Sequence, residues 1–322
     1  KAGKINIDAK VETTYNTRTI TPDFVNGYNY ASMINEARIT RAQEPLYQPY
    51  ELEILRLGLD PDLYPNVNWK DVLMKDGAMT YRGTVNMNGG GATARYFVSA
   101  SYIEEQGMYK TDENLRKDYD TNANAKRWNY RLNTDIDITK STLLKVGVSG
   151  SLKKVNEPGL GGDIWHSIMG QTPISIPLVY SNGYIPAYGT GNQTNPWVLA
   201  TQTGYEVWEN KIQTNVTLEQ KLDFITKGLS FVGRFGYDTN NKNNIKHEKW
   251  PEQWKAQRFR DENGELVFER ISTEQKMRIS SGASGERLEF FEAILQYDRG
   301  FKEHHLGGTL KYNQDSKIMT VD

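Results

Sequence analysis

The sequence predicts an all-β fold, an antiparallel β-barrel that crosses a membrane with its strands. Three observations support this prediction. Several segments alternate between apolar and polar residues, the connections between them alternate between short and long, and no segment is apolar enough for a membrane-spanning helix. Alternation with a period of two is typical of an extended strand, because successive side chains point to opposite faces of a sheet.

Alternation is clearest in three segments, 5–15, 127–138 and 211–224. In the last of these, KIQTNVTLEQKLDF, Val216 shares one face with the apolar residues and Asn215 shares the other with the polar ones. Weaker alternation predicts further strands over 80–88, 94–103, 142–153, 229–238, 287–298 and 304–313. Together these are about nine strands, most of them near the roughly 9 to 11 residues that a tilted strand needs to cross a bilayer.

The connections between these strands are sorted by length. Short turns are expected at 89–93, 139–141, 225–228 and 299–304, and long connections at 16–79, 104–126, 154–210 and 239–286. Because short and long alternate, an up-and-down meander collects every long loop at one end of the barrel and every turn at the other. A soluble Greek-key sandwich has no reason to sort its connections, so the sorting favours a membrane barrel.

Composition narrows the class of protein further. The 322 residues carry 39 basic and 40 acidic side chains, which gives no whole-chain electrostatic reason to expect nucleic acid as a partner. The chain has no cysteine, which excludes a disulfide scaffold, a thiolate metal site and a cysteine nucleophile. The first residues enter a strand directly without a secretory signal, as expected of a processed start or of a piece of a longer chain.

The long connections contain predicted structure of their own. Helical spacing of apolar residues within 23–41 and a short pattern at 69–76 predict two helices in the first loop. The segment 155–210 is rich in glycine, proline and aromatic residues, and we expect it to be an ordered surface loop.

Metal and catalytic sites have little support in the sequence. The spacing of a calcium loop occurs at Asp118, Asp120, Asn122 and Asn124. Ala123 replaces the glycine of that loop and Asn129 its closing glutamate, so a solvated loop is the better interpretation. Adjacent His304 and His305 point to opposite faces of a strand and cannot chelate one ion. We expect no metal, no cofactor and no catalytic residue.

Aromatic residues form the one candidate binding group. In the loop after residue 154 the candidates are Trp165, Tyr184, Tyr188 and Trp197. Indole and phenol rings stack on sugar rings and are typical of ligand sites, although they also pack the core of a loop or meet a partner protein. A second aromatic group lies near strand ends, at Tyr15, Tyr81, Tyr102, Trp128, Tyr237 and Tyr312. These fit the interfacial girdle of a membrane barrel or ordinary cross-strand packing, and only the register distinguishes the two.

Two motifs resemble a known family. They are DPDLYPNVNWKDVLMKD at 60–76 and VNMNGGGATARYFVSASYIEEQGM at 85–108. Their order and spacing are similar to the start of the barrel in SusC/RagA-like TonB-dependent transporters of Bacteroidetes outer membranes. The matching residues are Tyr64, Pro65, Asn66, Trp69, Gly89 to Gly91, Arg95, Tyr96, Val98, Ser99, Tyr102, Gln106 and Gly107. The helix that ends in NEAR, residues 35–38, also resembles the first loop of the family.

The resemblance implies a barrel of about 22 strands filled by an N-terminal plug, with a TonB-contacting segment before the plug. Nothing in residues 1–322 resembles that plug or that segment. About nine strands also leave two unpaired edges, which lipid does not tolerate. We therefore expect 1–322 to be a partial TonB-dependent receptor barrel domain whose plug and remaining strands are absent from this chain.

A function follows from the resemblance as an expectation. The protein would lie in the outer membrane of a Gram-negative bacterium, in contact with its lipid, and import oligosaccharides or, alternatively, peptides. It would pair with a SusD-like surface lipoprotein and draw energy from the TonB complex through the plug region, without acting as an enzyme. Two other classes stay open: a passive porin, and a secreted β-rich carbohydrate-binding module that would bury its apolar faces.

Overall fold

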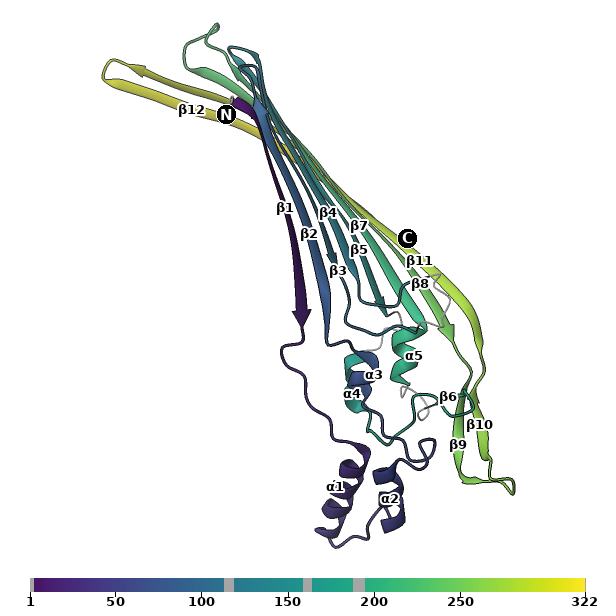
Figure 1. Ribbon diagram of the computed structural model, residues 1–322. Coiled ribbons are helices and arrows are strands. Elements are labelled where there is room, and N and C mark those ends of the chain that lie inside the picture. The colour runs from purple at the N-terminus through teal and green to yellow at the C-terminus, as the bar shows by residue number, and fades with distance from the viewer. Residues whose placement is uncertain (1–2, 113–118, 159–163, 188–194, 322) are drawn as a thin grey trace.

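A nine-stranded antiparallel sheet dominates the computed structural model of the protein, which describes residues 3–112, 119–158, 164–187 and 195–321. The long strands run side by side, and the helices gather beyond one end of the sheet (Figure 1). In sheet order the strands are β1 (Gly3–Thr17), β2 (Gly77–Gly90), β3 (Ala94–Glu105), β4 (Ala125–Thr139), β5 (Thr142–Pro158), β7 (Thr203–Lys221), β8 (Leu229–Trp250), β11 (Gln275–Phe301) and β12 (His304–Val321). Sheet order equals chain order, so the predicted all-β meander of nine strands is confirmed.

Several strands extend further than the sequence predicts. Most of the predicted long connection 239–286 is strand, because β8 continues to Trp250 and pairs there with the start of β11 at Gln275. Alternation fades in these extensions because both faces of the sheet meet water beyond the apolar band, and nothing then requires one face to be apolar. At the other end, β7 stops at Lys221, and Phe224 lies in the turn that the predicted strand 211–224 included.

The short connections are turns, as predicted. Gly228, just before β8, has φ +88°, and a Cβ there would lie 2.2 Å from the carbonyl oxygen of Asp298. A side chain here would be strained by the left-handed backbone and would collide with the neighbouring chain, so only glycine fits. Between β11 and β12 the turn is two residues long, and Lys302 takes φ 51° in it.

Register divides the sheet into two chemically different faces, since directly paired residues of antiparallel strands point to the same side. The row of partners through Val216 contains Val146 on β5 and Phe235 on β8. We call the face that carries these side chains the outer face. The opposite face carries Gln213 and Asn215 and is the inner face. The division into an apolar and a polar face that the sequence predicts therefore continues from strand to strand.

Large apolar side chains of the outer face are exposed to the surroundings. They include Ile5, Ile7, Val11, Val85, Leu132, Leu218, Phe235, Phe291, Leu295, Leu306, Leu310 and Tyr312. Val11 is 83% exposed and Leu310 71% exposed. Soluble proteins rarely leave so continuous an apolar surface uncovered, whereas the lipid-facing side of a membrane barrel requires one.

Aromatic residues of the outer face follow a diagonal across the strands. We call them the aromatic belt, and they are Tyr15, Tyr81, Tyr102, Trp128, Tyr237 and Tyr312. The row of partners through Tyr102 begins at Val11 on β1 and ends at Thr320 on β12. Tyr15 lies four residues from Val11 toward the loop end, and Tyr312 lies eight residues from Thr320 toward the turn end. From β1 to β12 the belt therefore moves by about 12 residues along the strands while it crosses eight steps between neighbouring strands. If the belt is parallel to the membrane surface, the strands are tilted by about 45°. Strands that cross a bilayer have about this tilt, so the register supports an interfacial girdle over ordinary pairing.

Among the residues that the structure describes, five short helices and a small sheet make up the loop end. The helices are α1 (Gly27–Ile39), α2 (Pro49–Leu57), α3 (Trp69–Leu73), α4 (Ile164–Gly170) and α5 (Pro196–Thr201). Helices α1 and α3 confirm the two predicted ones, and in the described ranges no helix is long and apolar enough to span a membrane. The small sheet contains β9 (Gln253–Arg260), β10 (Leu266–Ser272) and the two residues of β6 (Ile185–Pro186), with β9 in the middle.

A compact apolar core joins loops that are distant in the sequence. Its buried members are Trp69, Leu73, Ile164, Ile168, Ile176, Leu199 and Ala200. They come from the first long loop and from the loop between β5 and β7. Because α3, α4 and α5 share this core, the loops form one packed assembly at the end of the sheet (Figure 1).

Tyr64 anchors the chain between α2 and α3. Its hydroxyl donates a hydrogen bond of 2.9 Å to Oε1 of Glu51 on α2, and its amide bonds to the carbonyl of Asp60. Burial, together with the hydrogen bond to Glu51, raises the pKa of the Tyr64 phenol from 10.0 to about 12. The neutral phenol therefore stabilises this turn.

A charge on the outer face tests the assignment of the two faces. Val216→Lys is expected to prevent barrel assembly, because Val216 lies on the lipid side of the belt, where the cost of a charged side chain rises with depth to about 2–4 kcal/mol at the bilayer midplane. Asn215→Lys, one residue away on the inner face, is expected to assemble. Heat-modifiable gel mobility of the protein in outer-membrane fractions measures assembly, and equal levels for both variants would contradict the assignment.

The anchor at Tyr64 predicts a pH dependence in the loop assembly. A pKa raised in the folded state means that the stabilisation is fully present below pH 10 and is lost as pH rises through about 12. The difference in tyrosinate absorbance between the wild type and Tyr64→Phe isolates the titration of this phenol. We expect a midpoint near 12, and an ordinary midpoint near 10 would show that the phenol is not held as described.

Candidate functional site

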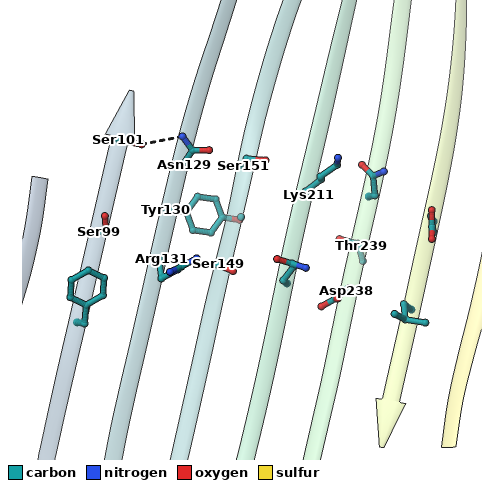
Figure 2. Close-up of a pocket in the computed structure, with 16 residues that line it drawn as sticks. Ser99, Ser101, Asn129, Tyr130, Arg131, Ser149, Ser151, Lys211, Asp238 and Thr239 are labelled. Carbon is teal, nitrogen blue, oxygen red and sulfur yellow. Dashed lines mark hydrogen bonds between the residues drawn. The ribbon is translucent and has the colours of Figure 1, made fainter. Parts of the chain in front are cut away.

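The inner face carries a hollow of about 670 Å³ near mid-height of the sheet, which we call the wall pocket. Figure 2 shows its side chains arranged across successive strands. Two neighbouring rows of register partners supply most of the lining. One row is Ser99, Arg131, Ser149, Gln213, Asp238 and Leu288, and the other is Ser101, Asn129, Ser151, Lys211, Asn240 and Glu286. Hydroxyl, amide and charged groups from six strands therefore meet on one surface.

Charge in the wall pocket is divided between its two sides. Arg131 and Lys211 lie on β4 and β7, whereas Asp238 and Glu286 lie on β8 and β11. Glu286 forms an ion pair of 2.7 Å with Lys317 outside the pocket. The side chains of Arg131 and Asp238 have no hydrogen-bond or ion-pair partner among the described residues. These groups can therefore bind a polar solute through hydrogen bonds.

Ion pairs stiffen the inner face closer to the turn end. Glu292 has a side chain only 3% exposed, and it pairs with Arg234 at 2.7 Å and with Lys311 at 2.5 Å. On neighbouring strands Lys145 pairs with Glu219 at 2.6 Å. The Glu292 carboxylate is covered by its two cationic partners, so these contacts link β8, β11 and β12 on the turn side of the wall pocket.

A second hollow of about 740 Å³ lies in the loop assembly, and we call it the loop pocket. The rings of Tyr184 and Trp254 stack in it with centroids 4.4 Å apart, and Phe268 meets Tyr184 edge-on at 5.2 Å. Asp60 and Arg260 also line this pocket, and their side chains form an ion pair of 2.8 Å. The loop pocket thus combines an aromatic surface with polar groups, which is the usual composition of a site for small polar ligands.

Hydrogen bonds hold the segments around the loop pocket in place. Asp62 accepts from the amide of Ser181 at 2.9 Å, which ties the first loop to the loop between β5 and β7. The amide of Ala256 on β9 donates to the hydroxyl of Tyr180 at 3.2 Å, and burial raises the pKa of that phenol. Three segments distant in the sequence are therefore linked at this pocket.

The four predicted aromatic residues do not form one site. Trp165 on α4 and Trp197 on α5 pack against the apolar core of the loops. Tyr184, which is 38% exposed, lies in the loop pocket, and Tyr188 lies outside the described residues. Trp254 and Phe268 of the loop pocket come from β9 and β10, more than sixty residues further along the chain. The contact of the four predicted residues with a ligand stays a prediction.

The segment with calcium-loop spacing closes on itself. Asp120 accepts from the amide of Asn122 at 2.9 Å and from the side chain of Asn124. Buried Asn122 accepts from the amide of Tyr109 and donates to the carbonyl of Gly107. Asp118 lies outside the described residues, and the described ranges contain no group of three metal-ligating side chains.

Comparison with known proteins gives one sequence relative and one fold. No protein-family model matches the chain. The TonB-dependent receptor P3 of Formosa agariphila is 25% identical over 188 residues, which are 55% of this chain and 17% of the receptor. The chain thus spans a small part of the length of this relative.

Solved structures of a RagAB peptide importer match nearly the whole chain. Its closed-closed state matches with a TM-score of 0.66 and 16% identity, over 98% of this chain and 36% of the other. Its open-open state matches with a TM-score of 0.65 and 16% identity, over 99% and 36%. At this identity the likeness shows the fold.

The fold and the sequence relative point to one kind of protein. The relatives are a receptor and an importer, and neither is an enzyme by its name. The register of the sheet, the exposed outer face and the two motifs agree with them. The chain is a partial β-barrel similar to that of SusC/RagA-like TonB-dependent transporters, and its place is the outer membrane of a Gram-negative bacterium.

Proposed function

We propose that this chain forms part of the barrel wall of a TonB-dependent importer that takes up nutrients, most consistently oligosaccharides. The observation that carries the proposal is a sheet with an exposed apolar outer face and a polar inner face, in the fold of the RagAB peptide importer. Such a wall separates lipid from a polar passage. The protein moves its cargo without making or breaking a bond in it, so it is a transporter and not an enzyme.

The domain proposal rests on the two edges of the sheet. Among the described residues, β1 pairs only with β2, and β12 pairs only with β11. Unpaired backbone N–H and C=O groups are too costly in the hydrocarbon of a bilayer, so a closed barrel needs further strands beside these two. We propose that residues 1–322 are a partial barrel domain and that the remaining strands and the plug belong to the rest of the protein.

Two partners follow from the resemblance to SusC/RagA-like transporters. One is a SusD-like surface lipoprotein at the loop end, where the packed loop assembly offers a firm surface. The other is the TonB complex, which would act through the plug region at the turn end. Together they would supply capture of the cargo and the energy to move it.

Oligosaccharide is the favoured cargo because of the chemistry of the two pockets. Hydroxyl and amide groups line the wall pocket, and the stacked rings of Tyr184 and Trp254 border the loop pocket. Hydrogen-bonding groups beside flat rings suit sugar rings. Peptide is the alternative cargo, and the solved structures with this fold favour it because they are described as a peptide importer.

The two other classes of function fit the structure less well. A secreted carbohydrate-binding module would cover its apolar face, but no second sheet packs on the outer face in the described ranges. A passive porin shares the wall described here and differs in having no plug. Transport that stops when the TonB complex is inactivated would support the importer, and transport that continues would support the porin.

Uptake by a strain that lacks the gene tests the cargo. We expect the deletion strain to lose growth on a subset of oligosaccharides, each as sole carbon source, and to keep growth on peptides. The intact gene restored on a plasmid should rescue growth. Loss restricted to peptides would identify the alternative cargo, and unchanged uptake of both classes would contradict the proposed import.

The wall pocket predicts a second effect on uptake. Arg131→Ala is expected to lower the apparent affinity for the imported oligosaccharide by about tenfold or more, because a hydrogen bond to a charged group contributes about 1.5–3 kcal/mol. Arg127→Ala, on the same strand and face but outside the pocket, is the matched control. The measurement is initial uptake rate against cargo concentration at equal surface levels, and equal affinities of the two variants would contradict a role for the pocket.

A further inference from the structure

A third hollow, of about 870 Å³, opens on the outer face of the sheet, and we call it the outer groove. Its side chains on β7, β8 and β11 include Trp208, Asn210, Tyr237, Asn241, Asn243 and Arg287. Register assigns them to the outer face, since Asn210 pairs with Asn241 and lies in the same row as Trp128 and Leu152. The outer groove is therefore on the opposite side of the sheet from the wall pocket.

The aromatic belt fixes the level of the outer groove in the membrane. Tyr237 belongs to the belt, and Asn241 and Asn243 follow it on β8 by four and six residues toward the loop end. With strands tilted by about 45°, these amides lie roughly 9 to 14 Å beyond the belt. Interfacial aromatic rings lie at the level of the lipid head groups. The outer groove therefore begins at the head groups of the outer leaflet and extends beyond them.

Polar groups in the outer groove have unused hydrogen-bonding capacity. The side-chain amides of Asn210, Asn241 and Asn243 have no hydrogen-bond partner among the described residues. Each amide offers two donors and one acceptor oxygen. Arg287 contacts Glu289 through Nε at 3.3 Å, so its two terminal nitrogens are directed to no described partner.

Ring and cationic groups border the same hollow. Trp208 donates to Glu206 through its indole nitrogen, and the ammonium group of Lys154 lies 4.9 Å from the ring centroid. On the side toward the membrane Tyr237 of the aromatic belt lines the hollow, and Ile318, which is 47% exposed, lines it beyond the belt. Glycine provides the floor, because a Cβ on Gly285 would lie 3.0 Å from Oδ1 of Asn241. A bulkier residue at Gly285 would reduce this space.

We propose that the outer groove binds the phosphorylated sugar head group of a glycolipid in the outer leaflet. Amides and a neighbouring indole ring match the hydroxyls and ring faces of a sugar. Lys154 is already paired with Glu206 at 2.8 Å, so the terminal nitrogens of Arg287 are the groups that would bind phosphate. The groove reaches the aromatic belt at Tyr237, so the acyl chains of the same molecule would lie along the apolar band below it. A phosphorylated glycolipid fits both the polar groove and the apolar surface below it.

Native mass spectrometry of the purified full-length protein, titrated with lipid A in detergent micelles, tests the proposal. Lipid A is used because it joins a phosphorylated disaccharide to acyl chains. We expect the double variant Asn241→Ala and Asn243→Ala to bind lipid A about tenfold or more weakly than the wild type, because two hydrogen-bonding amides are lost. Trp208→Leu is a second, independent variant with the same expected direction.

Asn244→Ala is the matched control, since Asn244 lies beside Asn243 on the same strand but on the inner face. It should bind lipid A as the wild type does, and heat-modifiable mobility checks that every variant is assembled. Three results would overturn the proposal: no binding of lipid A to the wild type, equal binding by the double variant and the control, or equally tight binding of phosphatidylglycerol. Equal binding of the deacylated disaccharide would also overturn it, because the site would then hold a soluble sugar and not a membrane lipid.

Discussion

Backbone hydrogen bonding between neighbouring strands is the constraint on which the rest of this structure depends. In lipid every N–H and C=O group needs a partner inside the protein, and a meander of antiparallel strands supplies one along its whole length. Continuous pairing also fixes the register, which carries the alternation of one strand to all the others. Among the described residues β1 and β12 each pair on one side only, so the same constraint requires a further partner at both edges.

Fixed register gives the sheet two working surfaces. Outward side chains form an apolar band with an aromatic belt along its loop side, and the diagonal course of the belt agrees with tilted strands in a level membrane. Inward side chains bring charged and polar groups from six strands into the wall pocket. A shift of one residue in a single strand pairing would exchange the two surfaces beyond that point.

The loop assembly is stabilised in a different way from the sheet. It lies in water and is held by its own apolar core around Leu73 and Ile168, in the manner of a small globular unit. Trp165 and Trp197 pack against this core, whereas Tyr184 joins Trp254 at the loop pocket. Aromatic residues within one sequence segment therefore serve two purposes, packing and an accessible ring surface.

Much of this architecture was determined by the sequence alone. Alternation, and the sorting of short and long connections, predicted nine antiparallel strands, their two faces and two loop helices, because these patterns reflect local geometry repeated along the chain. The extensions of β8 and β11 were missed, since strands with water on both sides need no alternation. Tertiary structure alone decided which side chains meet. Arg131 and Asp238 share a row, and Tyr184 stacks on Trp254 seventy residues away, because register and loop packing join segments that sequence spacing does not relate.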